Sequence, residues 1–217
     1  MINPNLQFWE IPIGGYEKWG NKKTYWDLIN GDRYDAFLLL TKNYVKGMMT
    51  WLSGILKNKG IPHIIIRTGI DEAIDNSKQK YPLSHNPERI KWNAVKFMRE
   101  SYVENGGKID NDTQFFVVGS MQPEKYDMPK VLDNLLNNPS ESIRTSIALS
   151  IPPHSPAVIE TKIKAMKQRI WLIAVESAAA GARVPNTQIY ADFKMIKDEI
   201  SLYRKQLDIS DEVRASF

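Results

Sequence analysis

The sequence contains no cysteine, and this absence excludes several kinds of chemistry at once. Disulfide scaffolds, thiolate metal sites and cysteine nucleophiles all need the thiol group. No apolar run approaches the roughly 20 residues that span a bilayer as a helix. The first residues have neither the basic start nor the apolar stretch of a signal peptide. We therefore expect an intracellular, cytoplasmic protein that has no membrane partner.

Catalytic and cofactor-binding motifs are also missing. The sequence has no Gly-x-Ser-x-Gly elbow, no Gly-x-x-x-x-Gly-Lys-Ser/Thr phosphate loop and no dinucleotide fingerprint. Its three histidines, His63, His85 and His154, lie beside prolines or in predicted loops, and no two have the spacing of metal ligands. These absences predict that the chain has no catalytic residues, no cofactor and no metal ion.

One small acidic cluster remains, formed by Asp71, Glu72 and Asp75. Carboxylates at this spacing are typical of the start of a helix, where the backbone dipole favours negative charge. A cation site would need further oxygen ligands that the surrounding sequence does not offer. We interpret the cluster as a helix start or a solvated loop.

The composition is that of an ordinary globular protein: 217 residues, 42% hydrophobic, 25% charged and 10% aromatic. Lys and Arg number 29 against 25 Asp and Glu, which gives a net charge of +4. This mild excess permits an anionic partner, and it equally permits contact between subunits.

Residues 1–31 are predicted to form an extended N-terminal arm. Proline and glycine are too dense for a helix, and the segment is too aromatic for a solvated tail. The arm either packs on its own domain or crosses onto a neighbouring subunit and makes the protein a homo-oligomer. Its candidate residues for self-association are the apolar side chains and the glycine hinge, namely Phe8, Trp9, Ile11, Ile13, Gly14 and Gly15.

Residues 32–151 are predicted to be a mainly helical core that contains short strands. Apolar residues at spacings of three and four indicate a helix over 32–57. Asn86 and Pro87 are typical of the first residues of a second helix, which Asn105 ends. The remaining predicted elements are strands over 64–66, 113–118 and 143–151, a loop over 74–83 and a helix over 128–136.

Residues 152–217 show the clearest periodicity in the chain. Apolar residues repeat at steps of three and four from Ile159 to Ser177, and again from Ile189 to Leu207. The two segments flank Gly181 and Pro185, which predicts an antiparallel helical hairpin. The expected fold class is therefore mainly α, an α+β fold with a minor short-stranded sheet, in which the hairpin follows the helical core.

Basic and aromatic residues share one face of the helix predicted to begin at Pro87. Arg89, Trp92, Lys96 and Arg99 lie opposite its apolar side, an arrangement that suits a phosphate backbone with a stacked base. The alternative is that the aliphatic stems of its neighbours simply cover the tryptophan. The hairpin repeats the pattern more weakly with Lys164, Lys167 and Trp171.

These features favour a non-enzymatic assembly protein that self-associates through its arm, with RNA or DNA as a candidate partner. A viral nucleocapsid or another virion component is a protein of this kind. The second hypothesis is a nucleic-acid-binding regulatory factor that is monomeric or dimeric. The third is an enzyme whose acid and base residues are dispersed, such as Glu160 or Asp192.

Overall fold

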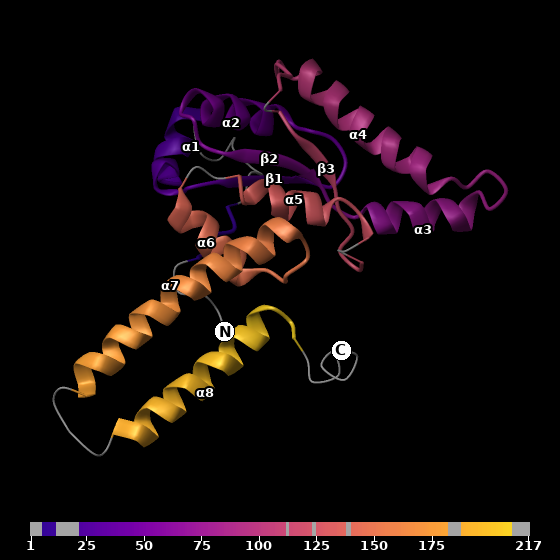
Figure 1. Cartoon of the computed structure of the whole chain (residues 1–217). Coiled ribbons are helices and arrows are strands. Elements are labelled where there is room, and N and C mark those ends of the chain that lie inside the picture. The colour runs from indigo at the N-terminus through magenta and orange to yellow at the C-terminus, as the bar shows by residue number, and fades with distance from the viewer. Residues whose placement is uncertain are drawn as a thin grey trace. The chain divides into compact units, whose positions relative to one another are not determined.

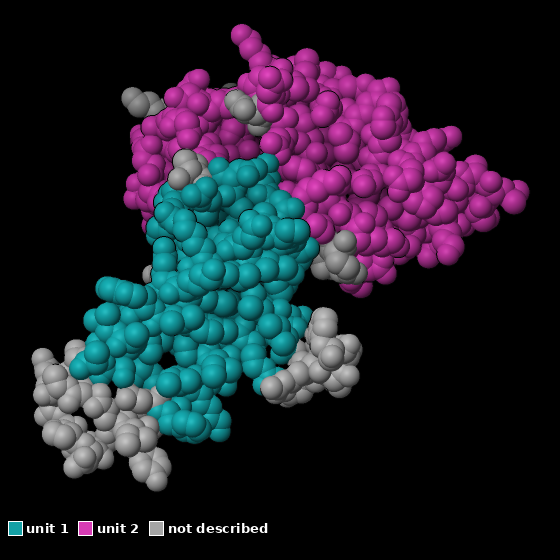
Figure 2. Space-filling model, in the orientation of Figure 1, with its two compact units in different colours: residues 1–7, 132–217 teal, residues 8–131 magenta. Residues whose placement is uncertain are grey.

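The computed structural model describes residues 6–11, 22–111, 113–122, 125–137, 140–181 and 188–209. The chain divides into two compact units, one formed by residues 8–131 and the other by residues 1–7 with 132–217 (Figure 2). Each unit has its own hydrophobic core. The two units are therefore taken separately.

A parallel sheet of three strands lies at the centre of the unit formed by residues 8–131 (Figure 1). Its strands, in spatial order, are β1 (Phe37–Thr41), β2 (His63–Arg67) and β3 (Phe115–Val117). The register pairs Leu39 of β1 with Ile65 of β2, and Ile65 with Phe115 of β3. The central strand β2 contains three consecutive buried isoleucines, as expected of a parallel strand that is covered on both faces.

Helices connect the parallel strands, because a parallel pair needs a crossover rather than a tight turn. Helix α2 (Gly47–Asn58) links β1 to β2, and α3 (Ile70–Lys80) with α4 (Pro87–Glu104) link β2 to β3. The unit also contains α1 (Lys22–Leu28) and the short 3-10 helix η2 (Gly31–Arg33), and α5 (Met128–Leu135) begins in it.

Helices α2 and α4 pack on the face of the sheet to which Ile65 contributes. The core on this face joins Leu52 of α2 and Met98 of α4 to Ile65 and to Val117 of β3. All four side chains are nearly inaccessible to solvent. Burial of apolar side chains is the main source of stability for such a layer, at about 25 cal/mol per Å² removed from water.

The second unit contains α6 (Glu141–Ser150), α7 (Pro156–Gly181) and α8 (Gln188–Gln206). A small core of Leu136, Ile147, Ala148 and Val158 holds α6 against the start of α7. Polar contacts then join α7 to α8. They comprise the ion pair of Arg169 with Glu199, the bond from Lys162 Nζ to the Gln206 carbonyl at 2.9 Å, and the bond from the Tyr203 hydroxyl to the Met166 carbonyl at 3.4 Å.

The predicted fold class is wrong, because the protein is an α/β protein built on a parallel sheet. The error begins at residues 32–57, which were predicted to be one helix. Phe37, Thr41, Tyr44 and Met48 have helical spacing, but Phe37 to Thr41 form β1 and the helix begins only at Gly47. Residues 37–40 are a continuous apolar run, which a buried strand and a helix share.

Three further elements were predicted wrongly. The segment 74–83, predicted to be a loop, mostly belongs to α3. The segment 143–151, predicted to be a strand, belongs to α6, and the Ser140 side chain caps that helix by accepting from the Ile143 N–H. The predicted arm includes α1, in which Tyr25 and Trp26 are buried within their own unit. Burial of Tyr25 and Trp26 explains the difference in the arm, whereas the Ser140 cap is a local signal for α6.

Several local predictions are confirmed. The strand over 64–66 lies within β2, and β3 lies within residues 113–118. Helix α4 begins at Pro87, and the Asn86 side chain caps it by accepting from the Arg89 N–H at 2.9 Å. The helix predicted over 128–136 is α5. The domain boundaries predicted after residues 31 and 151 stay a prediction.

Candidate functional site

The carboxyl ends of three parallel strands meet at one edge of the sheet. In open α/β sheets, ligands bind in the crevice outside this edge. The chain leaves β2 through Thr68 and Gly69, and it leaves β3 through Val118 and Gly119. Backbone bonds hold the exits together, because the Thr68 N–H donates to the Thr41 carbonyl at 2.8 Å and the Val118 N–H donates to the Arg67 carbonyl at 2.8 Å.

Gly69 turns the chain from β2 into helix α3. Its backbone is left-handed, with φ of 72° and ψ of 30°, a conformation that is strained for residues with a Cβ. This turn brings Asp71 into the first turn of α3, directly at the carboxyl edge of the sheet. The Ile70 N–H, one residue earlier, donates to the Val118 carbonyl at 3.3 Å.

The Asp71 carboxylate is buried against the segment that follows β3. Its Oδ2 accepts the Met121 N–H at 2.7 Å, and its Oδ1 accepts the Glu72 N–H at 2.9 Å. The side chain is only 8% exposed. The Met121 N–H, helped by other backbone N–H groups including that of Ser120, lowers the pKa of Asp71 below its ordinary value, so the group is ionised at neutral pH.

Gly119 allows two side chains to approach the backbone beneath this carboxylate. A Cβ at this position would lie 2.7 Å from Cε2 of Tyr126 and 3.0 Å from Oδ2 of Asp71. Burial, followed by the negative charges of Asp71 and Asp75, raises the pKa of the Tyr126 phenol. The site therefore combines an ionised carboxylate, a tyrosine held in its neutral form and a loop of backbone N–H groups.

A lysine side chain lies at the same edge of the sheet. Lys42, which follows β1, forms an ion pair with Glu72 at 3.1 Å, and both side chains are mostly exposed. Its Cε would lie 4.0 Å from a Cβ placed at Gly69. Exposed pairs of this kind contribute little to stability, so Lys42 can leave Glu72 at small cost.

A serine and a histidine elsewhere in this unit are hydrogen-bonded as in some catalytic sites, but the serine hydroxyl is not accessible to a substrate. The Ser53 hydroxyl lies 2.8 Å from Nε2 of His63 and 3.0 Å from the Tyr102 hydroxyl. Ser53 is completely buried. Burial lowers the pKa of His63. This network joins α2, β2 and α4, and no substrate can reach its hydroxyl.

The predicted basic face lies on the exposed side of α4. Trp92 is 61% exposed, with Lys96 Nζ 5.2 Å from its ring centroid, and Lys96 also pairs with Glu100 at 3.7 Å. Arg99 points differently, with its guanidinium 5.7 Å from the ring centroid of Phe115. Arg89 is exposed near the start of the helix. Ligand binding by these four side chains stays a prediction.

The weaker patch on α7 is described as well. Lys164 forms an ion pair with Glu141 at 2.6 Å, Lys167 is exposed and Trp171 is 68% exposed.

The residues of the predicted arm are described only in part. Phe8 is 77% exposed, the centroid of the Trp9 ring lies 4.2 Å from the Arg33 guanidinium, and Ile11 packs on the core. The other predicted arm residues, Ile13, Gly14 and Gly15, lie outside the described residues.

The sequence predicted that Asp71 belongs to a helix start or a solvated loop. It does lie in the first turn of α3, but its place at the edge of the sheet gives it a further role. A usable signal was present: a run of isoleucines, then Arg67-Thr68-Gly69, then an acid. Such an order of strand, glycine turn and acidic residue would place a carboxylate at the carboxyl end of a parallel strand.

Comparison with known proteins identifies relatives over almost the whole chain. The family model described as interferon-inducible GTPase (IIGP) matches residues 2–214. The mouse T-cell-specific guanine nucleotide triphosphate-binding protein 2 is 26% identical over 209 residues, covering 96% of this chain and 49% of its own length. Mouse interferon-gamma-inducible GTPase 10 is 25% identical over 211 residues, with the same coverage of both chains. Bovine interferon-inducible GTPase 5 is 22% identical over 211 residues, 96% of this chain and 44% of its own.

These matches correct four of the functional expectations. The chain is not a viral nucleocapsid or virion component, and the expected virion location is wrong, because its relatives are interferon-inducible GTPases. The nucleic-acid-binding interpretation is wrong for the same reason. The expectation of a non-enzymatic protein is wrong too, because the members of this family are GTPases.

The chain spans about half the length of the curated relatives it matches. The family model nevertheless covers nearly every residue from one end of the printed sequence to the other, over both compact units. A match of this extent settles the relationship: the chain belongs to the interferon-inducible GTPase family.

Proposed function

We propose that this chain supplies the base-binding part of a guanine-nucleotide site and that Asp71 contacts the base. The observation that carries the proposal is the ionised Asp71 carboxylate at the carboxyl edge of a parallel sheet, beside the loop that begins at Gly119. The relatives named as GTPases and as guanine nucleotide triphosphate-binding proteins support the choice of ligand.

The chemistry of the base explains why a carboxylate is suitable. Guanine presents two adjacent N–H donors, at N1 and at the 2-amino group, and an aspartate accepts both because an ionised carboxylate has about four lone-pair sites. Adenine has no proton on N1, so its N1 lone pair would face the carboxylate and no hydrogen bond would form there. Loss of a hydrogen bond to a charged group costs about 1.5–3 kcal/mol, which is the source of discrimination between the two bases.

The same carboxylate is held by several backbone N–H groups. Its oxygens accept from Met121 and from Glu72, and the N–H of Ser120 also stabilises its charge. These bonds hold the carboxylate in place and keep it charged. A guanine edge would share the two oxygens with the backbone donors, because an ionised carboxylate has about four lone-pair sites.

The residues present do not provide the loop that holds the phosphates of GTP in many nucleotide-binding proteins. The 217 residues contain no Gly-x-x-x-x-Gly-Lys-Ser/Thr loop, the element that cradles phosphates in many nucleotide-binding proteins. Within the described part of the chain, no group of three acidic or histidine side chains could hold a metal ion. No step of GTP hydrolysis therefore follows from these residues, and our proposal concerns binding of the base.

The proposal is tested by titrating the ¹⁵N-labelled 217-residue chain with guanosine and GDP, and with adenosine and ADP as controls. Guanosine and GDP should shift the same amide resonances, those of Gly69, Asp71, Ser120 and Met121, with dissociation constants of about 1 mM, equivalent to about 4 kcal/mol. Adenosine and ADP should leave these resonances in place. Equal shifts with both bases, or none with guanosine up to about 10 mM, would contradict the proposal.

Replacing one carboxylate oxygen of Asp71 by an amide nitrogen tests whether the side chain contacts the base or has only a structural role. Asp71→Asn should lose guanosine binding and gain binding of xanthosine, because xanthine carries a carbonyl where guanine has its amino group and the Asn amide donates to it. Asp75→Asn is the matched control, since Asp75 is an exposed acid one turn later on α3. A variant Asp71→Asn that keeps guanosine binding, or that binds neither nucleoside while remaining folded, excludes Asp71 as the base contact.

A further inference from the structure

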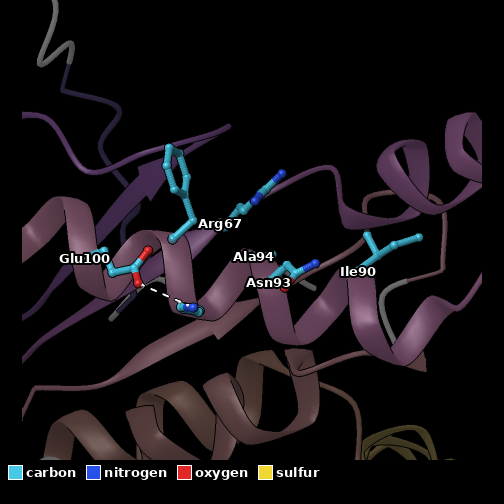
Figure 3. Close-up of a pocket in the computed structure, with 7 residues that line it drawn as sticks. Arg67, Ile90, Asn93, Ala94 and Glu100 are labelled. Atoms are coloured by element: carbon cyan, nitrogen blue, oxygen red, sulfur yellow. Dashed lines mark ion pairs between the residues drawn. The ribbon is translucent and has the colours of Figure 1, made fainter.

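A pocket lies beside helix α4, and its lining residues differ from those around Asp71. It has a volume of about 460 Å³, within the range of small-molecule sites, and it is open to solvent. Arg67 at the end of β2 lines it from the sheet, and the other lining side chains come from α4 (Figure 3). Because side chains alternate along a strand, Arg67 shares a face of β2 with Ile65, the face on which α4 packs.

The Arg67 guanidinium is incompletely satisfied. Its Nε is buried and, within the part of the chain that the structure describes, has no hydrogen-bond partner. Burial lowers the pKa of Arg67 below its ordinary value, but a guanidinium stays charged at any pH that a folded protein meets. Buried donors without a partner are rare enough to call for an explanation.

The charges that line the pocket leave a positive balance. Lys96 adds a second cation, and Glu100 is the one acid among the lining residues that the structure describes. Glu100 pairs with Lys96 at 3.7 Å, and each side chain is about half exposed. This exposed pair is weak, and Arg67 forms no ion pair with Glu100.

The rest of the pocket combines apolar surface with one amide. Ile90 and Ala94 form apolar lining, and Phe97, which is half exposed, adds an aromatic ring. Asn93 contributes a side-chain amide from the same helix, and Figure 3 shows it next to Ala94 and near Arg67. A suitable ligand therefore needs an anionic end and an apolar body.

We propose that this pocket binds a small organic anion, with its carboxylate or phosphate group on Arg67 and its apolar body against Ala94 and Phe97. Arginine presents planar, paired N–H donors that match either group in two-point geometry. Lys96 adds attraction as a point charge, and the Asn93 amide donates to an oxygen of the anion. The anion pairs with the charge of Arg67, whose Nε has no hydrogen-bond partner within the described residues.

The test follows the Arg67 Nε–H resonance by NMR during titration with phenylacetate and with phenyl phosphate at low salt. Both probes should shift this resonance in a saturable way. Benzyl alcohol, which has the ring without the charge, should bind at least about tenfold more weakly, since it cannot form hydrogen bonds between two charged groups. The anion that binds with the higher affinity identifies the preferred head group, carboxylate or phosphate. A preference for either one supports the proposed site.

Variants locate the binding and control for folding. Lys96→Gln and Arg67→Gln should each weaken the binding of the better probe, Arg67→Gln by about tenfold or more. Arg67→Gln should not lower the melting temperature, because the charge it removes is partly buried and has no ion pair within the described residues. Arg89→Gln is the matched control, since it removes an exposed cation of α4 that does not line the pocket.

Two outcomes would overturn the proposal: no saturable shift at Arg67 with either anion, or unchanged affinity in both Arg67→Gln and Lys96→Gln. The variant Asp71→Asn separates this site from the guanine site, because it should keep phenyl phosphate binding while it loses guanosine. If Asp71→Asn abolishes both, the pocket is not an independent anion site.

Discussion

The backbone N–H of Met121 donates a 2.7 Å hydrogen bond to Oδ2 of Asp71, which lies fifty residues earlier in the chain. This bond joins the exit of β3 to the start of α3 and keeps the carboxylate ionised. A single side chain thus links two neighbouring strand ends, and this makes Asp71 important for stability as well as for the proposed base contact.

Acid should therefore weaken the folded state through Asp71. The folded-state pKa of this group is lowered, so its stabilisation is complete above the unfolded pKa of about 3.9 and is lost as pH falls through the lower folded value. Urea unfolding at pH 7 and at pH 3 measures the effect. Asp71→Asn should lower the free energy of unfolding by about 1–2 kcal/mol at pH 7. Between pH 7 and pH 3, the variant should lose less of this free energy than the wild type does. An unchanged acid loss in Asp71→Asn contradicts this assignment, and Asp75→Asn provides the comparison.

A methyl group at Gly119 should disturb the site by sterics alone. Gly119→Ala places its Cβ 2.7 Å from the Tyr126 ring and 3.0 Å from the Asp71 carboxylate, so we expect a loss of about 1–3 kcal/mol in the free energy of unfolding. Gly54→Ala is the control. Its Cβ meets nothing within 4 Å inside α2, and the change should stabilise the protein by about 0.5–1 kcal/mol. Equal effects at the two positions would rule out the steric account.

The buried network of Ser53, His63 and Tyr102 should make stability depend on pH near neutrality. Burial lowers the folded pKa of His63, so the unfolded chain takes up protons first. Stability should be constant above the unfolded value of about 6.5 and should fall as pH drops from there towards the folded pKa. Thermal unfolding at pH 7.5 and at pH 5.5 tests this. His63→Gln should flatten the dependence, whereas a flat profile in the wild type would contradict it. His85→Gln, at a histidine outside the network, serves as the control.

Self-association through the N-terminal segment stays a prediction that one measurement addresses. Phe8 and Trp9 remain largely exposed, although Arg33 lies over the Trp9 ring. Light scattering should show a lower molar mass after deletion of residues 1–15, and a similar decrease for the double variant Phe8→Ser, Trp9→Ser. Leu83→Ser, which removes a fully exposed leucine between α3 and α4, should leave the mass unchanged. A monomer in the intact chain would exclude the arm as an interface.

Local sequence signals predicted those elements whose ends are marked by side-chain chemistry. The Asn86 cap and Pro87 placed the start of α4 correctly because a cap bond forms between residues three apart. Short apolar runs marked β2 and β3 for a similar reason, since turn residues bound them closely. No such boundary exists between Phe37 and Met48, and there the spacing of apolar residues predicted one continuous helix. The structure instead has a strand, a bend and the start of a helix over these residues.

The candidate sites depend on contacts that periodicity does not encode. Asp71 meets Met121, and Arg67 faces α4, only because the parallel register places distant segments at one edge and on one face of the sheet. The sequence by itself determined the missing thiol chemistry, the absence of a phosphate loop and the position of several elements, since each is a property of nearby residues. The tertiary structure decided the sheet, the ionised carboxylate and the burial of the Arg67 Nε without a hydrogen-bond partner among the described residues, because burial and hydrogen bonding depend on residues far apart in the chain.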